Sequence, residues 1–183
     1  MTQGRIVIIT GTPATGKSTL ASLLANQSDK EKSVHMHTDD FYHFIKKGRI
    51  APHLKKAHLQ NKIVIDAFLE ATKVFAQNGY DVIVDGIVGP WFLDPWFQAA
   101  KDGFDVHYII LRASKEETLT RGRNRNKLDE ATNLELIQTM WDQFNQLGEF
   151  EAHVLDTTTQ TIEQSLDQVR QCIQDHSMRL NPS

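Results

Sequence analysis

Eight residues near the start of the chain, Gly11 to Ser18, constrain the fold more than any other segment; their sequence is Gly-Thr-Pro-Ala-Thr-Gly-Lys-Ser. The run 5–10 before them is rich in Ile and Val, which favours a strand buried on both faces. The run 18–25 after them has the apolar spacing of a helix. A strand, a glycine-containing loop and a helix in this order match the phosphate-binding loop, or P-loop, with the pattern G-x-x-x-x-G-K-[ST].

The chemistry expected of this loop follows from its residue types. Gly11 and Gly16 permit backbone conformations that a side chain forbids, so that amide N–H groups can surround a phosphate. The start of the helix adds its positive dipole end. Lys17 supplies a positive charge for the outer phosphates, and the Ser18 hydroxyl is placed to ligate Mg²⁺. We therefore expect ATP and Mg²⁺ as cofactors, with the nucleotide bound by Gly11, Thr12, Pro13, Ala14, Thr15, Gly16, Lys17, Ser18 and Thr19.

The composition narrows the class of protein. The chain has 183 residues, of which 40% are hydrophobic and 23% charged, as expected of one soluble globular domain over 1–183. The net charge of −3 argues against a broad nucleic-acid-binding face. The single cysteine, Cys172, excludes an intrachain disulfide. Because a signal peptide and a long apolar run are both missing, we expect a cytoplasmic protein with no membrane partner.

Strand patterns alternate with helix patterns along the chain, which predicts an α/β fold with three layers: a five-stranded parallel sheet with helices on both faces. Strands are expected at 5–10, 33–38, 81–85, 106–111 and 153–155, and helices from 18, over 60–78, from 115, over 134–147 and over 161–173. A basic segment within about 40–60 is expected to be a mobile excursion that binds substrate; its basic residues are Lys46, Lys47, Arg49, Lys55 and Lys56.

Three aspartates follow predicted strands, where ligands bind in parallel sheets. Asp39 could accept a proton from a substrate hydroxyl, whereas Asp40 would point the other way in an extended chain. The alternative role for either residue is a helix N-cap before Phe41. Asp85 could hold Mg²⁺ through water or contact the substrate; its alternative role is a turn formed with Gly86.

A second cluster of positive charge lies at 121–127, after a predicted strand and helix. Arginine suits phosphate oxygens because its planar fork can bond two of them at once. The cluster and the residues up to 132 are typical of a lid that closes over the nucleotide, while the plainer interpretation is a solvated face.

Aromatic residues and histidines form two further patterns. The stretch 89–97 could line a substrate pocket or pack a short helix after Pro95 into the core. His35 and His37 share one face of a predicted strand. Metal binding would require further ligands, so we interpret these histidines as packing or pocket polarity.

The chain resembles the small P-loop kinases of the shikimate kinase, gluconate kinase and chloramphenicol phosphotransferase type, and more distantly nucleoside kinases. The resemblance covers most of the chain and rests on Gly11 to Ser18, Asp39, Asp85, Arg121 and Arg125. It implies the strand order 2-3-1-4-5. It also implies that Asp39 binds the acceptor hydroxyl, that Arg121 packs on adenine and that Arg125, in the lid, reaches the phosphates.

The chain departs from each of these families in detail. It has His37-Thr38-Asp39 where shikimate kinases have Asp-x-Asp, and Asp85-Gly86-Ile87-Val88-Gly89 where they have a glycine run. Tyr42 stands where gluconate kinases have a histidine. The segment from Asp39 to Tyr42 resembles the acidic motif of uridine kinases instead. The resemblance therefore defines the class of enzyme rather than its substrate.

The function expected is an ATP- and Mg²⁺-dependent kinase acting on a hydroxyl of a small molecule. Its catalytic residues would be Lys17, Asp39 and Arg125, and its metal ligands Ser18 and Asp85. One alternative is a nucleotide or polynucleotide end kinase, in which the basic excursion holds an acceptor phosphate. The other is a nucleotide-dependent regulatory ATPase without an acceptor, which would not need Asp39.

Overall fold

The computed structural model describes residues 3–124 and 130–181. Its central sheet is parallel, with the strand order β2-β3-β1-β4-β5. The strands are β1 (Arg5–Gly11), β2 (Ser33–His37), β3 (Asp81–Asp85), β4 (Asp105–Arg112) and β5 (Val154–Asp156). The predicted class and strand order are confirmed, and the P-loop lies at the carboxyl end of the central strand.

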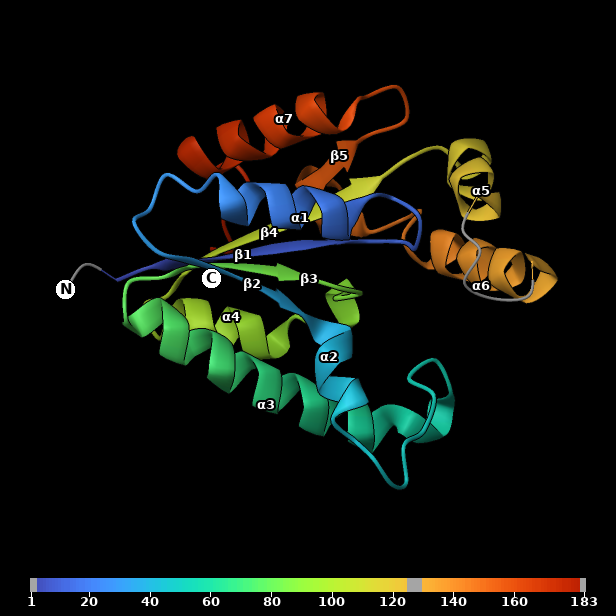
Figure 1. Ribbon diagram of the computed structural model, residues 1–183, viewed down its shortest axis with the longest axis horizontal. Coiled ribbons are helices and arrows are strands. Elements are labelled where there is room, and N and C mark those ends of the chain that lie inside the picture. Colours follow the sequence, from blue (N-terminus) through green and yellow to red (C-terminus); the bar gives the residue numbers. More distant parts are fainter. Residues whose placement is uncertain (1–2, 125–129, 182–183) are drawn as a thin grey trace.

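Helices cover both faces of this sheet (Figure 1). On one face lie α1 (Lys17–Asn26) and α7 (Ile162–Gln174); on the other lie α3 (His58–Gln77) and α4 (Asp94–Lys101). Beyond the carboxyl ends of the strands lie α2 (Thr38–His43), α5 (Lys115–Arg123) and α6 (Glu130–Gln143). Short 3-10 turns occur at Lys55–Ala57, Pro90–Phe92 and Gly148–His153. Within the described residues, no helix has both the length and the apolar character needed to span a bilayer.

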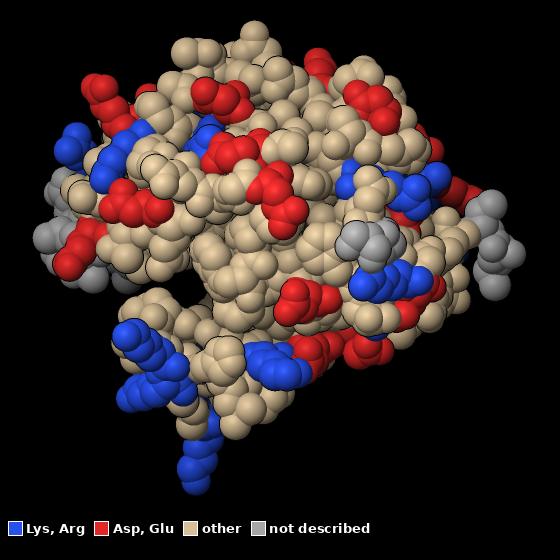
Figure 2. All heavy atoms as spheres, turned by 180° about the vertical axis from the view of Figure 1, so that it is seen from behind, with Lys and Arg blue, Asp and Glu red and all other residues tan. Residues whose placement is uncertain are grey.

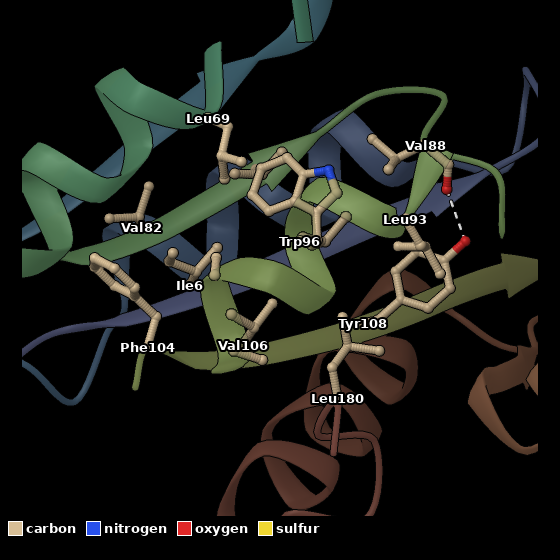
Figure 3. Close-up of a cluster of buried hydrophobic side chains, with 14 of the residues drawn as sticks. Ile6, Leu69, Val82, Val88, Leu93, Trp96, Phe104, Val106, Tyr108 and Leu180 are labelled. Carbon is tan, nitrogen blue, oxygen red and sulfur yellow. Dashed lines mark hydrogen bonds between the residues drawn. The ribbon is translucent and has the colours of Figure 1, made fainter. Parts of the chain in front are cut away.

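The core explains why β1 is an unbroken apolar run. Ile6 and Ile8 pack toward α3 and α4, while Val7 and Ile9 pack toward α1 and α7, because successive side chains alternate between the faces of a strand. In Figure 3 Tyr108 lies in the first of these clusters, and its hydroxyl donates a 2.7 Å hydrogen bond to the carbonyl of Val88. That bond ties β4 to the segment that follows β3.

Two helices differ from the sequence-based prediction. The helix expected over 134–147 is observed as α6, Glu130–Gln143, so its predicted ends were both wrong. Phe144 and Leu147 are buried, but Arg112 Nη1 donates to the carbonyls of Phe144 and Asn145, and the chain there leaves the helix. Their apolar spacing reflects core burial rather than continued helix. The short helix α2 was expected only in the alternative that placed an N-cap before Phe41; it begins at Thr38, so the second strand ends one residue earlier than predicted.

Candidate functional site

The loop between β1 and α1 has the backbone that its glycines predicted. Gly11 has φ 138°, and a Cβ there would lie 2.2 Å from the carbonyl oxygen of Leu111, so only glycine fits. Ala14 and Gly16 have φ of 66° and 82°, in the left-handed region. Left-handed residues within a tight loop turn backbone N–H groups toward one side, which forms an anion-binding concavity.

Side chains of the loop reinforce this conformation. Thr15 Oγ1 donates a 3.0 Å hydrogen bond to the carbonyl of Thr12, and Lys17 Nζ donates to the same oxygen at 3.3 Å. Lys17 is 8% exposed, so its ammonium group is held against the loop. Thr19, by contrast, lies exposed in the first turn of α1. The loop therefore combines N–H donors with a held positive charge, as phosphate binding requires.

The structure brings together the two residues predicted as metal ligands. Ser18 Oγ, at the start of α1, donates a 3.0 Å hydrogen bond to Oδ1 of Asp85, at the end of β3. The Asp85 side chain is fully buried. A hydroxyl and a carboxylate from two elements thus meet beside the phosphate-binding loop.

Two histidines that were not among the predicted site residues contact Asp85. His35 Nε2 bonds to Oδ2 of Asp85, and His37 Nδ1 lies 3.2 Å from Oδ1. Burial by itself would raise the pKa of Asp85, but His35, His37 and Ser18 together hold the pKa of that carboxyl below its usual value. The H-x-H pattern on β2 was the available signal, and its interpretation as pocket polarity fits these contacts.

A close approach between the end of β3 and the start of α2 fixes this arrangement. Gly86 follows Asp85 with φ 151°, and a Cβ on it would lie 1.9 Å from Oγ1 of Thr38. The end of β3 and the start of α2 are therefore in contact at a position where a side chain does not fit. The glycine sets the distance between Asp85 and the first turn of α2.

The two aspartates after β2 lie in that first turn. Asp39 and Asp40 are both exposed, and the N-cap of α2 is His37, so the interpretation of either aspartate as an N-cap before Phe41 is wrong. The Asp39 side chain is 62% exposed, and its Oδ2 lies 3.7 Å from Nε2 of His37. His37 thus lies between the buried carboxylate of Asp85 and the exposed one of Asp39.

Arg121 borders a cavity of about 380 Å³ next to the P-loop. Its Nε donates a 2.7 Å hydrogen bond to Glu117, and its Nη2 donates to the carbonyl of Thr157 at 3.0 Å. The rest of the cavity wall comes from the P-loop, from the turn before α7 and from the first residues of that helix; it includes Ala14, Thr15, Gly16, Gln160, Thr161, Ile162 and Ser165. Arg125 and residues 125–129 of the expected lid lie outside the described residues.

The basic excursion projects from the body of the protein. Figure 2 shows Lys and Arg side chains on this projection and a hollow between it and the rest of the face. Gln60, at the start of α3, bonds both the N–H and the carbonyl of Ile50, at 2.8 and 2.7 Å, which holds the returning chain in place. All five cations are exposed, and none has an ion pair in the described part of the chain: Lys46, Lys47, Arg49, Lys55 and Lys56.

The aromatic stretch divides between the two predicted roles. Trp96 is 1% exposed and packs edge-on against Phe68, so it belongs to the core. Trp91 is 50% exposed and contacts the ring of Phe144 after α6. Trp91 is placed where a ligand could touch it, and Phe97 lines a separate cavity of about 480 Å³.

Comparisons with solved structures show the same fold in several small proteins. Mycobacterium tuberculosis APS kinase CysC, in complex with AMPPNP and APS, matches with a TM-score of 0.71 and 16% identity over 95% of this chain and 99% of that one. A tunicamycin resistance protein from Deinococcus radiodurans gives 0.64 and 19%, over 98% and 100%. A gluconokinase from Sinorhizobium meliloti 1021 gives 0.63 and 15%, over 96% and 94%. The fold is thus that of small P-loop kinases.

A search of curated proteins finds no significant match. Among family models, the one described as "AAA domain" matches residues 7–140, which include the P-loop, Asp39, Asp85 and Arg121. This match spans more than half of the chain and contains the P-loop and the residues around Asp85. The chain therefore belongs to the AAA domain family of P-loop proteins.

Proposed function

We propose that this protein is an ATP- and Mg²⁺-dependent phosphotransferase that transfers the γ-phosphoryl group of ATP to a hydroxyl of a small molecule. The observation that carries the proposal is the 3.0 Å contact between Ser18 Oγ and the buried carboxylate of Asp85, beside the P-loop. Two proteins with the same fold, the gluconokinase and the APS kinase, are kinases, which supports the proposal.

The residues at this contact suit magnesium. A hydroxyl and a carboxylate are hard oxygen donors, which Mg²⁺ prefers, and it usually keeps several waters. Ser18 would ligate the ion directly and Asp85 through water. When bound, Mg²⁺ neutralises charge on the outer phosphates. His35 and His37 hold the Asp85 carboxylate in a fixed orientation for this role.

The other site residues would each bind a different part of the nucleotide. The P-loop amides and Lys17 would bind the phosphates, where Lys17 also balances charge that develops during transfer. Adenine would occupy the cavity of about 380 Å³ against Arg121, whose guanidinium is held by Glu117 and Thr157. Arg125, in the predicted lid, would reach the phosphates.

Asp39 is the proposed acceptor residue. Asp39 is exposed in the first turn of α2, at the same end of the sheet as the P-loop. The helix leads into the basic excursion. An acceptor hydroxyl could therefore lie between Asp39 and the terminal phosphate. Its carboxylate would orient that hydroxyl and take its proton. A regulatory ATPase without an acceptor would have no need of this residue.

One observation favours a more specific alternative, a nucleotide or polynucleotide end kinase. The five cations of the excursion lack ion pairs within residues 3–124 and 130–181, and an acceptor that carries a phosphate would neutralise them. In that case phosphorylated acceptors would be preferred over neutral ones.

The test is a screen for ADP release from ATP and Mg²⁺, stimulated by small hydroxyl compounds in matched neutral and phosphorylated forms. Any compound that stimulates release identifies an acceptor, and the preferred form decides between the two candidates. If no compound stimulates release above the slow hydrolysis of ATP, the acceptor kinase is refuted in favour of the regulatory ATPase.

With an acceptor in hand, Asp39→Asn should reduce acceptor phosphorylation by roughly 10²–10⁴, the usual effect of losing a general base. ATP affinity should stay within about a few-fold, because the P-loop is untouched. Asp40→Asn is the matched control: it removes the same charge from the same helical turn. Equal effects of the two variants would exclude Asp39 from the mechanism.

A further inference from the structure

A cluster of potential metal ligands lies at the opposite end of the sheet from the P-loop. Asp105 and His107 are two residues apart at the start of β4, so they share one face of that strand. His176 follows α7, which covers the same face. One ligand atom from each residue lies within 4.8 Å of the others. In Figure 1 the C-terminal mark also lies at this end, where the strands begin.

His107 is the unusual member of this cluster. Its side chain is fully buried, and neither ring nitrogen has a hydrogen-bond partner in the described part of the chain. Nε2 approaches Oδ1 of Asp105 at 3.3 Å, outside hydrogen-bond geometry, and the ring stacks on that of His176 with centroids 5.5 Å apart. Buried polar groups nearly always form hydrogen bonds, so a buried imidazole that forms none and faces a carboxylate and a second imidazole is a candidate metal ligand.

The donor set suggests which ligand this is. We propose that Asp105, His107 and His176 bind one Zn²⁺ or a similar divalent transition-metal ion. Imidazole nitrogens suit zinc and its neighbours rather than Mg²⁺, and two imidazoles with one carboxylate leave a fourth position for water. Zinc bonds of about 2.0–2.2 Å place ligand atoms roughly 3.4 Å apart. Because the ligand atoms lie within 4.8 Å of one another, the widest separation must shorten by at most about 1.4 Å. His176 is exposed in a turn and can supply that movement.

Arg179 is a cation that would compete with a metal ion for Asp105. Its Nε lies 2.8 Å from Oδ1 of Asp105, the oxygen that His107 also approaches. A metal ion at this carboxylate would have to displace the guanidinium or share the oxygen with it. Removal of Arg179 should therefore strengthen metal binding, whereas a plain ion pair between Arg179 and Asp105 predicts no metal binding at all.

The site would fasten the end of the chain to the sheet. Tyr108 N–H donates to the carbonyl of Met178 at 2.9 Å, and Leu180 N–H donates to that of Val106 at 2.8 Å. Figure 3 shows Leu180 beside Val106 and Tyr108. A metal ion held by β4 and His176 would add a third attachment, so its predicted role is structural and independent of the proposed kinase activity.

The experiment is a titration of metal-stripped protein with ZnCl₂, followed by calorimetry, with Co²⁺ as a spectroscopic probe of ligand geometry. We expect one ion per chain. At zinc about 100-fold above its Kd, the Tm should rise by roughly 5–10 °C, because only the folded chain assembles the site. Absence of stoichiometric binding would overturn the proposal.

Variants locate the site. His176 has φ 58°, a conformation that asparagine tolerates, so His176→Asn should fold normally yet bind zinc roughly tenfold more weakly or worse. Arg179→Gln should bind zinc more tightly than the natural chain. His53→Asn, which removes an exposed histidine from the excursion, is the control and should bind zinc unchanged. Unaltered binding in both His176→Asn and Arg179→Gln would show that zinc binds elsewhere and refute the site.

Discussion

Gly86 offers a direct test of how the site is positioned. A Cβ at this residue would lie 1.9 Å from Oγ1 of Thr38 and 2.8 Å from both its Cβ and its Cγ2. Rotation of the threonine side chain can move Oγ1 away, but it leaves the Cβ contact in place. Gly86→Ala must therefore push the end of β3 and the start of α2 apart, or it must bend the backbone between them.

The expected cost has two parts. Overpacking of a tight contact typically costs about 1–3 kcal/mol. A non-glycine residue held at a φ of 151° adds roughly 1–3 kcal/mol of backbone strain. We therefore expect Gly86→Ala to lower the free energy of unfolding by about 3 kcal/mol, within a range of about 2–5 kcal/mol.

Urea unfolding, followed by fluorescence, measures this change. Gly103→Ala is the matched control, since Gly103 also has a positive φ, 95°, but nothing lies within 4 Å of its added Cβ. The control should show only the backbone strain. Adding Thr38→Ala to Gly86→Ala should recover roughly 1 kcal/mol, because Oγ1 and Cγ2 are removed while Cβ remains. If Gly86→Ala costs no more than Gly103→Ala, the close approach between the end of β3 and the start of α2 is refuted.

Three further outcomes are expected. Lys17→Ala should slow ADP release by roughly 10²–10³, through loss of the charge that balances the transferred phosphoryl group; an unchanged rate would refute the P-loop assignment. Arg121→Ala should weaken ATP binding by roughly three- to thirtyfold in a nucleotide titration, with less effect on kcat, whereas the exposed control Arg123→Ala should change neither. The Arg112 guanidinium lowers the pKa of Glu151 to about 2, so the stability that this pair contributes is present above pH 4.5 and lost as the pH falls toward 2. Because Glu151 is partly exposed, Glu151→Gln should cost only about 0.5–1 kcal/mol in urea unfolding at pH 7 and nothing near pH 2; an equal cost at both pH values would contradict this.

The local sequence determined those elements of the protein that depend on short residue patterns. The unbroken Ile and Val run of β1 required burial on both faces, and Gly11 and Gly16 required positive φ angles, so strand, loop and helix could all be predicted. The alternation of strands and helices could also be recognised from the sequence, and it predicted the parallel sheet. The family resemblance supplied the strand order, which no local pattern contains.

Tertiary structure alone decided which side chains meet. Ser18 and Asp85 each followed from a local motif, but the two histidines that hold Asp85 reach it only because β2 lies next to β3 in a particular register. The helix α2 makes Asp39 a helical residue rather than a strand end, and its first residue, Thr38, lies against Gly86 from another element. A one-residue shift of a strand would exchange its faces, so contacts of this kind are set by packing rather than by any short segment.

The cluster around His107 shows the same limit most clearly. Its aspartate and first histidine are neighbours on β4, where the sequence shows only a polar alternation within a buried strand. The second histidine arrives from the turn after α7, 69 positions later along the chain. Periodicity predicted the strands and the longer helices because it reports burial of one face at a time. Convergence of three ligands depends on where two separate elements pack, and only the folded chain specifies that.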